Sequence, residues 1–267
     1  MNIPIETVQV GDFQMNYFRF GSGQKTMVIL PGLSVQSVMG FAESVAAEYE
    51  VMTNDFTVYV FDRRSELPKV YSVDEMARDT AEAFKALGLC DIYLFGASQG
   101  GMMAMRIAVE YPGLVRRLAL GSTSPHLKEQ QFAAMGQWLD LARQKDGEGL
   151  YLAFGEKLYS PEMFARSREM LALAGRTVTD EEFARFAVLA DGTNGFDMTG
   201  SLHRIACPVL AIGSQDDRVV GPEGTEAIVR VLGGRQDFET YMYDGFGHAA
   251  YDTAPDYRQR IYDFFMR

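Results

Sequence analysis

The chain has 267 residues, of which 47% are hydrophobic and 23% are charged. These proportions are typical of a globular protein with a large core, and they exclude a disordered chain, a collagen-like fibre and a small disulfide-stapled protein. The 36 acidic and 25 basic side chains give a formal net charge of −11. This balance argues against sequence-independent binding to nucleic acid or to an anionic membrane, because both require a basic face.

The N-terminal segment, residues 1–10, lacks a basic region followed by an apolar run, so we expect no secretion signal. The longest uncharged stretch, residues 26–42, is interrupted by Pro31 and is too short to span a bilayer. Cys90 and Cys207 lie far apart in apolar stretches, and we expect two buried, reduced thiols. These features predict a cytoplasmic protein without membrane insertion.

Strand and helix patterns alternate from the start of the chain. Residues 7–10 and 13–20 flank Gly11 and Asp12, which is typical of a hairpin. Five later runs are apolar throughout and end at Gly, Pro or Asp, as strands buried on both faces do. These runs are residues 26–30, 58–61, 92–95, 118–120 and 209–212. Helical patterns at residues 72–87 and 100–110 lie between them, so the alternation predicts a mostly parallel sheet covered on both faces.

The alternation stops after Gly121, and only helical patterns follow as far as Arg204. The four candidate helices are residues 127–145, 147–158, 161–174 and 180–191. Ser160 before Pro161 is a typical helix start, and Thr179 with Glu182 fits a capping box. We therefore expect residues 122–204 to form a helical cap, or lid, inserted into a core made of residues 1–121 and 205–267.

A serine between glycines stands where a predicted strand meets a predicted helix. Gly96, Ala97, Ser98, Gln99 and Gly100 form this segment. Small residues two positions before and after a serine at such a turn let its side chain point into a cleft. The helix N-terminus favours negative charge that develops nearby. Ser98 is therefore a candidate nucleophile, and the alternative is a glycine-rich turn without chemistry.

A serine hydroxyl is a weak nucleophile and needs a neighbouring base. The chain has three histidines. His126 and His203 lie near the ends of the predicted cap, where we expect surface or boundary positions. His248 follows Gly247 on a loop after the predicted strand 238–243, and a histidine there can reach a site at the carboxyl end of a sheet. His248 is the candidate base.

A third group must hold the imidazole in one tautomer and stabilise its charged form. Asp216 and Asp217 follow the predicted strand 209–212, and either carboxylate can serve. The alternative for each is an acid that caps the loop near Arg218. A metal site is not expected, because no His or Cys cluster accompanies these acids and Glu223. We expect no cofactor.

The chain order Ser98, Asp216, His248 resembles the α/β-hydrolase fold superfamily, in its serine-nucleophile branch with a helical cap. The resemblance extends over the whole chain. It is carried by residues 30–33, 61–64, 96–100, 207–210, 213–216 and 247–248. It implies an α/β fold with a mostly parallel eight-stranded sheet, flanking helices and an α-helical cap after strand 6. It also places the acid three residues after the loop glycine, which selects Asp216 and leaves Asp217 as the alternative.

The resemblance further implies an oxyanion hole made by the backbone N–H groups of Leu33 and Gln99. Two departures from the family pattern limit the resemblance. Residues 31–34 do not read His-Gly-Gly-Gly, which sets the chain apart from the hormone-sensitive-lipase branch, and residues 65–68 lack the usual glycines, so we expect a differently shaped loop there. Ser98 also excludes the relatives that use an aspartate nucleophile, the haloalkane dehalogenases and epoxide hydrolases.

These features predict a serine hydrolase that cleaves a small or medium, largely apolar carboxylic ester through an acyl-enzyme. Two other reactions remain open for the same triad: hydrolysis of a carbon–carbon bond in a diketone-type substrate, and acyl transfer to an acceptor other than water. A ligand-binding protein that retains the triad with little turnover is the alternative of another class. In each case we expect a small-molecule partner and no nucleic acid. Most aromatic residues of the predicted cap should form its core, and a minority should line an apolar pocket.

Overall fold

An eight-stranded sheet runs through residues 2–267, which the structure, a computed structural model, describes apart from the side chain of Gln130. Met1, where the predicted core begins, lies outside the described residues. The strands are β1 (Ile5–Val10), β2 (Phe13–Phe20), β3 (Lys25–Leu30), β4 (Phe56–Arg64), β5 (Ile92–Ala97), β6 (Val115–Gly121), β7 (Val209–Ser214) and β8 (Phe238–Tyr243). They are arranged in the order β1-β2-β4-β3-β5-β6-β7-β8. The β1–β2 and β2–β4 pairs are antiparallel and the other pairs are parallel, which confirms the predicted fold class.

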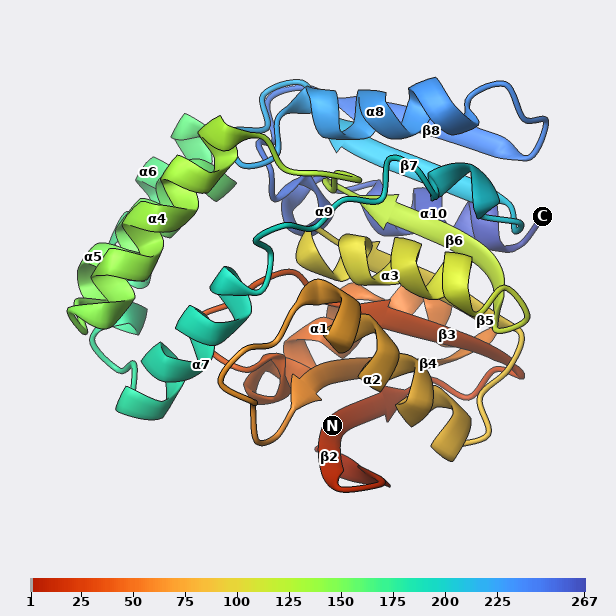
Figure 1. Cartoon of the computed structure of the whole chain (residues 1–267), viewed down its shortest axis with the longest axis horizontal. Coiled ribbons are helices and arrows are strands. Elements are labelled where there is room, and N and C mark those ends of the chain that lie inside the picture. The colour runs from red at the N-terminus through yellow and green to blue at the C-terminus, as the bar shows by residue number, and fades with distance from the viewer. Residues whose placement is uncertain (1) are drawn as a thin grey trace.

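Helices cover both faces of the sheet. They are α1 (Ala42–Glu48), α2 (Val73–Ala86), α3 (Gln99–Glu110), α8 (Pro222–Leu232), α9 (Ala250–Thr253) and α10 (Tyr257–Phe265), with short 3₁₀ turns at Val38–Phe41, Glu50–Met52 and Leu202–Arg204. Alternate residues of each strand face opposite layers. Val28 and Leu30 of β3 pack in the cluster that holds α2, α3 and α8, whereas Met27 and Ile29 pack in the cluster that holds α9 and α10. The sheet is therefore the middle of a three-layer core (Figure 1).

Four helices lie between β6 and β7, grouped at one side of the sheet (at the left in Figure 1). They are α4 (Glu129–Arg143), α5 (Gly147–Leu158), α6 (Pro161–Gly175) and α7 (Asp180–Asp191), and we call them the helical insert. The Ser160 cap, the first-turn Pro161 and the capping box of Thr179 and Glu182 are all present, as the sequence predicts. Their own apolar cluster surrounds Trp138 and Phe186. The division into a core and a cap at residues 122 and 204 remains a prediction.

Polar bridges join the helical insert to the sheet. Arg185 of α7 forms an ion pair with the buried Asp62 at the end of β4, and Ser37 donates to the same carboxylate. Gln36 accepts a hydrogen bond from Tyr151 Oη of α5 (2.8 Å) and donates to Glu182 of α7. Because these partners come from loops at the carboxyl ends of strands, the insert is held over that edge of the sheet.

Three features differ from the sequence predictions. Helices α1 and α8 were not predicted, although Pro222 in the first turn of α8 is a typical helix-start signal. The first insert helix begins at Glu129 rather than at residue 127. Cys90 and Cys207 are both free, as predicted, but Cys90 is exposed in the connection between α2 and β5 and only Cys207 is partly buried.

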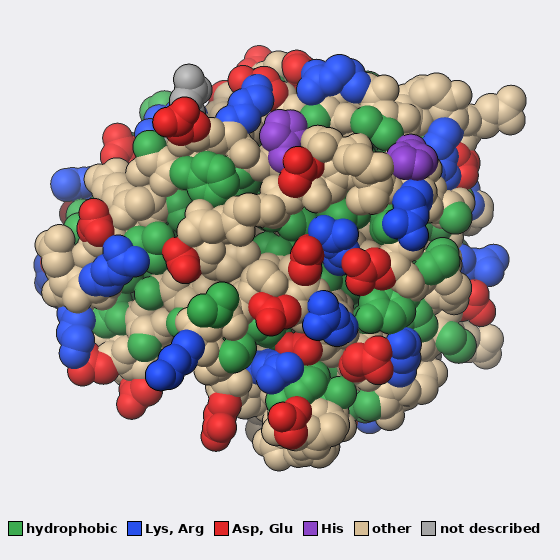
Figure 2. Space-filling view, in the orientation of Figure 1, with side chains coloured by type: hydrophobic (Ala, Val, Ile, Leu, Met, Phe, Trp, Pro, Cys, Tyr) green, Lys and Arg blue, Asp and Glu red, His purple; other side chains and the backbone are tan. Residues whose placement is uncertain are grey.

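Acidic and basic side chains are interspersed on the face seen in Figure 2, with no large patch of one sign on that face. Among the described residues, no helix is both long and apolar enough to cross a membrane. No group of three or more His, Cys, Asp or Glu side chains within the same residues is arranged to hold a metal ion.

Candidate active site

Ser98 occupies a tight turn between β5 and α3. Its backbone has φ of +52° and ψ of −120°, a left-handed conformation that non-glycine residues rarely adopt. The Ser98 N–H donates to the carbonyl of Gly121 at the end of β6 (2.8 Å), which fixes the turn to the neighbouring strand. Strained backbone of this kind is found at functional sites, where the surrounding structure holds it in place.

The glycines on either side of Ser98 are required by close backbone contacts. A Cβ atom at Gly96 would lie 2.4 Å from the carbonyl oxygen of Gly100, and one at Gly100 would lie 2.0 Å from the carbonyl oxygen of Leu30. The turn therefore packs directly against the end of β3. This explains physically why the segment around Ser98 has glycines two positions before and after the serine.

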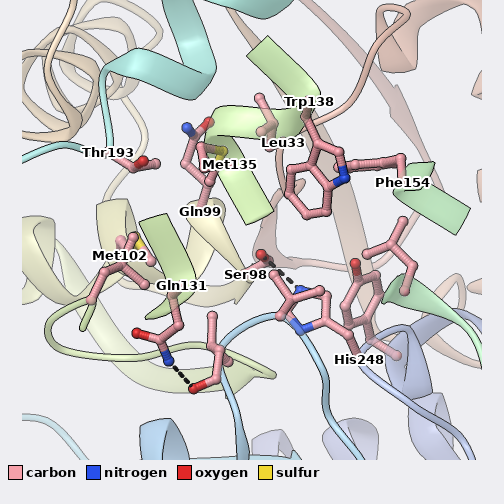
Figure 3. Close-up of a pocket in the computed structure, with 15 residues that line it drawn as sticks. Leu33, Ser98, Gln99, Met102, Gln131, Met135, Trp138, Phe154, Thr193 and His248 are labelled. Carbon is pink, nitrogen blue, oxygen red and sulfur yellow. Dashed lines mark hydrogen bonds between the residues drawn. The ribbon is translucent and has the colours of Figure 1, made fainter. Parts of the chain in front are cut away.

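His248 lies beside Ser98. Its Nε2 atom is 2.9 Å from Ser98 Oγ, and the side chain is buried. Gly247, with φ of +69°, turns the chain into position, and the N–H of Ala249 donates to the carbonyl of Leu158 at the end of α5 (2.9 Å). The loop that carries His248 is thus fixed against the helical insert. The structure brings together Ser98 and His248, two of the three residues that the sequence predicts for the triad (Figure 3).

The acid beside His248 is Asp217, and the prediction of Asp216 is wrong on this point. Asp217 Oδ2 lies 2.8 Å from His248 Nδ1, and the other carboxylate oxygen accepts from the N–H groups of Val219 and Val220 at 2.8 and 3.0 Å. Burial opposes ionisation of Asp217. The electrostatic attraction and hydrogen bond of His248, together with the two N–H groups, nevertheless hold the pKa of Asp217 below its ordinary value. Asp217 is therefore ionised, and its negative charge lies beside the imidazole of His248.

Asp216 contacts the backbone of the histidine loop instead. Its carboxylate accepts from Ser214 Oγ (2.7 Å) and from the N–H groups of Gly245 (3.2 Å) and Gly247 (3.0 Å). The N–H of Asp217 donates to the carbonyl of Ser214 in a tight turn, and the two neighbouring carboxylates point to different parts of the site. This turn explains why Asp217 rather than Asp216 contacts His248. Spacing from the loop glycine does not distinguish two adjacent aspartates in such a turn.

The two residues whose N–H groups were expected to form an oxyanion hole, Leu33 and Gln99, both line the pocket next to Ser98. Gln99 is the first residue of α3, so its N–H has no acceptor within the helix. Leu33 follows β3 in a loop that packs closely on the nucleophile, since a Cβ atom at Gly32 would lie 3.2 Å from Ser98 Cβ. Within the described part of the chain, neither of these N–H groups donates a hydrogen bond.

A buried arginine that sequence reasoning did not single out joins these two loops. Arg63 Nη2 donates to the carbonyl oxygen of Pro31 (2.8 Å) and to Gln99 Oε1 (2.9 Å). The Gln99 amide in turn donates to the carbonyl of Leu189 in α7 (2.7 Å). Burial lowers the pKa of Arg63 to about 10, partly offset by Asp62, so the guanidinium stays charged near neutral pH. The Asp62-Arg63 pair at the strand end was visible in the sequence, but its contacts were not.

The pocket around Ser98 is small and mostly apolar. We call it the nucleophile pocket, and its free volume is about 30 Å³. Met135 and Trp138 of α4 and Phe154 of α5 close it from the insert side, across from Ser98 (Figure 3). These residues are the minority of insert aromatics and neighbours that the sequence expected to line a pocket. Because roughly 10–15 Å³ of such free space holds one water molecule, the pocket beside Ser98 accepts a small group of atoms.

The other two histidines lie away from this pocket. His126 is half-buried at the start of the insert, where its backbone pairs with Asp197, and His203 is exposed in a 3₁₀ turn. Neither lines the nucleophile pocket. The structure therefore places them as the sequence predicts, at boundary and surface positions.

Comparison with known proteins agrees with this arrangement. The family model described as the alpha/beta hydrolase fold matches residues 25–255. The chain is 27% identical over 259 residues to the pyrrolizixenacetamide deacetylase of Xenorhabdus hominickii, covering 93% of each chain. It is 26% identical over 245 residues to the putative carbamate hydrolase RutD of Pantoea ananatis, covering 87% of this chain and 84% of that protein.

A solved structure shows the same fold along the full chain. The alpha/beta hydrolase enzyme MGS-M2, from a Medee basin deep-sea metagenome library, superposes with a TM-score of 0.86 at 19% sequence identity, covering 99% of this chain and 98% of that chain. The family match spans most of the sequence and includes both Ser98 and His248. The chain therefore belongs to the α/β-hydrolase fold family and is an enzyme of the hydrolase class.

Proposed function

We propose that this protein is a serine hydrolase that cleaves a small or medium, largely apolar carboxylic ester through a Ser98–His248–Asp217 triad. The observation that carries the proposal is the continuous chain of contacts from Ser98 Oγ to His248 Nε2 (2.9 Å) and from His248 Nδ1 to Asp217 Oδ2 (2.8 Å). A base within hydrogen-bond distance of a serine, itself oriented by a buried carboxylate, is the arrangement that activates a hydroxyl nucleophile.

The reaction follows from these contacts. His248 donates from Nδ1 to Asp217, so its Nε2 is free to accept the proton of Ser98 as Oγ attacks the substrate carbonyl carbon. The carbonyl oxygen takes up the negative charge, and the N–H groups of Leu33 and Gln99 stabilise it. His248 then gives the proton to the departing alcohol oxygen as the ester bond breaks. A water molecule, deprotonated by His248, hydrolyses the acyl-enzyme and restores Ser98.

The helical insert acts in this proposal as a cap that keeps water from the acyl-enzyme. Support comes from Trp138 and Phe154, which close the nucleophile pocket, and from the bond between Ala249 and Leu158 that joins the histidine loop to α5. A water-excluded site strengthens the electrostatic interactions inside it. The reducing cytoplasm is the proposed compartment, supported by the two free cysteines, and the proposed partner is a small molecule rather than nucleic acid.

The names of the two relatives indicate which acyl groups should be tested as substrates. One is called a deacetylase and the other a putative carbamate hydrolase, and removal of an acetyl group needs only a few atoms beside the nucleophile. The nucleophile pocket fits such a group, because its free volume is about 30 Å³. A short acyl chain is therefore expected to be processed at least as well as a long one.

The test is a panel of p-nitrophenyl esters from acetate to octanoate, with Ser98→Ala as the control. We expect kcat/KM to be highest for a short or medium acyl chain and to vanish in the control. If the protein hydrolyses no ester but cleaves a 1,3-diketone, or transfers an acyl group to an added alcohol, that reaction would replace ester hydrolysis as the proposed function. No turnover of any substrate by the folded protein would favour a ligand-binding role.

A further inference from the structure

A second cavity adjoins the nucleophile pocket, and we call it the second chamber. Its volume is about 370 Å³, within the range of small-molecule sites, whereas the nucleophile pocket offers about 30 Å³. Leu33, Phe154, Leu158 and Tyr251 form walls of both spaces. A substrate with more bulk than the nucleophile pocket holds can extend into the second chamber, which is the adjoining space.

The second chamber begins within one residue of the reacting atoms. Gly32 and Ala97, the chain neighbours of Leu33 and Ser98, line it. A Cβ atom at Gly32 would lie 3.2 Å from Ser98 Cβ and 3.7 Å from Tyr251 Oη. The Tyr251 ring packs edge-on against His248, with 5.9 Å between the ring centres. Tyr251 thus stands at the boundary between the triad and the chamber.

The walls of the second chamber combine aromatic rings with one carboxylate that has no partner. Phe41, Tyr49, Tyr159 and Tyr251 line it together with two carboxylates, those of Glu48 and Asp252. Within residues 2–267, the Asp252 carboxylate makes no hydrogen bond or ion pair with another side chain, and the residue is exposed and lines the chamber. Aromatic faces and a carboxylate in a confined space are the groups that recognise an organic cation.

The neighbouring charges do not neutralise Asp252. Arg258 lies closest, but its guanidinium forms an ion pair with Glu48 and donates from Nη1 to the backbone oxygen of Asp252 (3.0 Å) rather than to the carboxylate. Glu48 lines the chamber and is paired with Arg258, which leaves Asp252 as the unpaired charge of the lining. Asp252 keeps exposed surface, yet desolvation by the protein around it raises the pKa of its carboxyl to about 7, with Arg258 opposing this change and Glu48 adding to it. A cation bound in the chamber would relieve this desolvation.

We infer that the second chamber binds a positively charged nitrogen of the substrate, an alkylammonium or quaternary ammonium group, through Asp252 and the surrounding aromatic rings. The substrate is then an ester with a short apolar skeleton and one cationic end. This inference rests on the proposed ester hydrolysis at Ser98, and it names the substrate class of that same site. The cationic end passes Tyr251 while the carbonyl stays beside Ser98.

The experiment compares esters that differ only in charge. One pair is acetylcholine and 3,3-dimethylbutyl acetate, which places the cation on the alcohol side. The other pair is the p-nitrophenyl esters of 6-aminohexanoate and heptanoate, which places it on the acyl side. We expect the cationic member of at least one pair to have a kcat/KM about tenfold higher, after correction for uncatalysed hydrolysis, because cation–aromatic and charge-assisted contacts in a desolvated site are of that size.

The matched variants are Asp252→Asn and, as the control, Asp263→Asn on the exposed surface of α10. Asp252→Asn should abolish the cationic preference, and Asp263→Asn should retain it. Wild-type protein that hydrolyses the neutral esters without preferring either cationic member would overturn this inference and leave the proposed function intact. A preference that survives Asp252→Asn would also overturn it. Absence of all ester hydrolysis would contradict the proposed function itself.

Discussion

The two cavities that meet at Tyr251 are built in opposite ways. In the nucleophile pocket the triad side chains are paired, since Ser98, His248 and Asp217 contact one another and Arg63 holds the adjoining loops. The second chamber is about ten times larger, 370 against 30 Å³, and one of its carboxylates, that of Asp252, has no partner. Paired groups fix the geometry of a reaction, whereas an unpaired charge awaits a ligand. The comparison indicates that the bond is cleaved in the nucleophile pocket, whereas the substrate is recognised in the second chamber.

The largest expected effect is the loss of the nucleophile or of its base. Ser98→Ala and His248→Ala should each lower kcat about 10⁶-fold, because members of a triad act as a unit. Initial rates with the best p-nitrophenyl ester measure the loss, and circular dichroism checks that each variant is folded. Residual kcat within tenfold of wild type in either variant would remove the nucleophile pocket from the reaction.

The next effect separates the two neighbouring aspartates. Asp217→Asn should lower kcat about 10⁴-fold, as expected when the carboxylate that orients the imidazole becomes an amide. Asp216→Asn should cost at most about 10², because Asp216 positions the histidine loop through Gly245 and Gly247 without touching the imidazole. The ratio of the two kcat values is the measurement. Equal losses, or a larger loss for Asp216→Asn, would contradict the assignment of Asp217.

A smaller effect is expected from Arg63, which positions the loops of Leu33 and Gln99. Arg63→Met should lower kcat about 10²-fold with little change in KM, since a displaced oxyanion donor weakens binding of the transition state more than of the substrate. Arg116→Met, at an exposed arginine of β6, is the control. Steady-state kinetics separate the two constants. An increase in KM with unchanged kcat would assign Arg63 to substrate binding or to folding alone.

The smallest effect concerns pH and sharpens the contrast between the two spaces. The pKa of the Asp252 carboxyl is raised to about 7 by desolvation, so the group is neutral below that pH and ionised above it. The preference for a cationic over a neutral ester should therefore increase about fivefold between pH 6 and pH 8, following the ionised fraction. Taking the ratio of the two substrates cancels any effect of pH on the chemical step, which both substrates share.

The charged and titratable groups around Asp252 do not reverse this sign. Glu48 of α1 and Arg258 of α10 are paired with each other. Burial raises the pKa of Tyr159 to about 12 and that of Tyr251 well above its ordinary value, so both hydroxyls stay neutral between pH 6 and 8. The full pH profile of the ratio, measured with a quaternary ammonium ester whose charge does not titrate, checks the prediction. A ratio that does not change with pH would show that Asp252 does not bind the cation.

The sequence predicted those parts of the site that local rules determine. Ser98 and His248 follow strands at the carboxyl end of a parallel sheet, so their convergence can be read from order and spacing. The helix bounds in the insert follow from caps such as Ser160 and Thr179. Asp217 was only the alternative, because a single turn at Ser214 decides which of two adjacent carboxylates faces His248.

Long-range contacts explain what the sequence did not predict. Arg63 acts across the sheet on Pro31 and Gln99, and no pattern in the chain links these residues. Asp252 lies in a short helix whose polar residues suggest a solvated surface, and only the packing of α1 and the insert turns that surface into the wall of a chamber. Specificity residues of this kind depend on tertiary packing rather than on local sequence.

The central claim is that Ser98 is a nucleophile activated by His248. The most direct measurement is intact-protein mass spectrometry after treatment with a fluorophosphonate, which labels activated serines covalently. We expect one label per wild-type chain, located on Ser98 by peptide mapping, no label in Ser98→Ala and much slower labelling in His248→Ala. Folded wild-type protein that takes up no label, or a label carried by another residue, would contradict it.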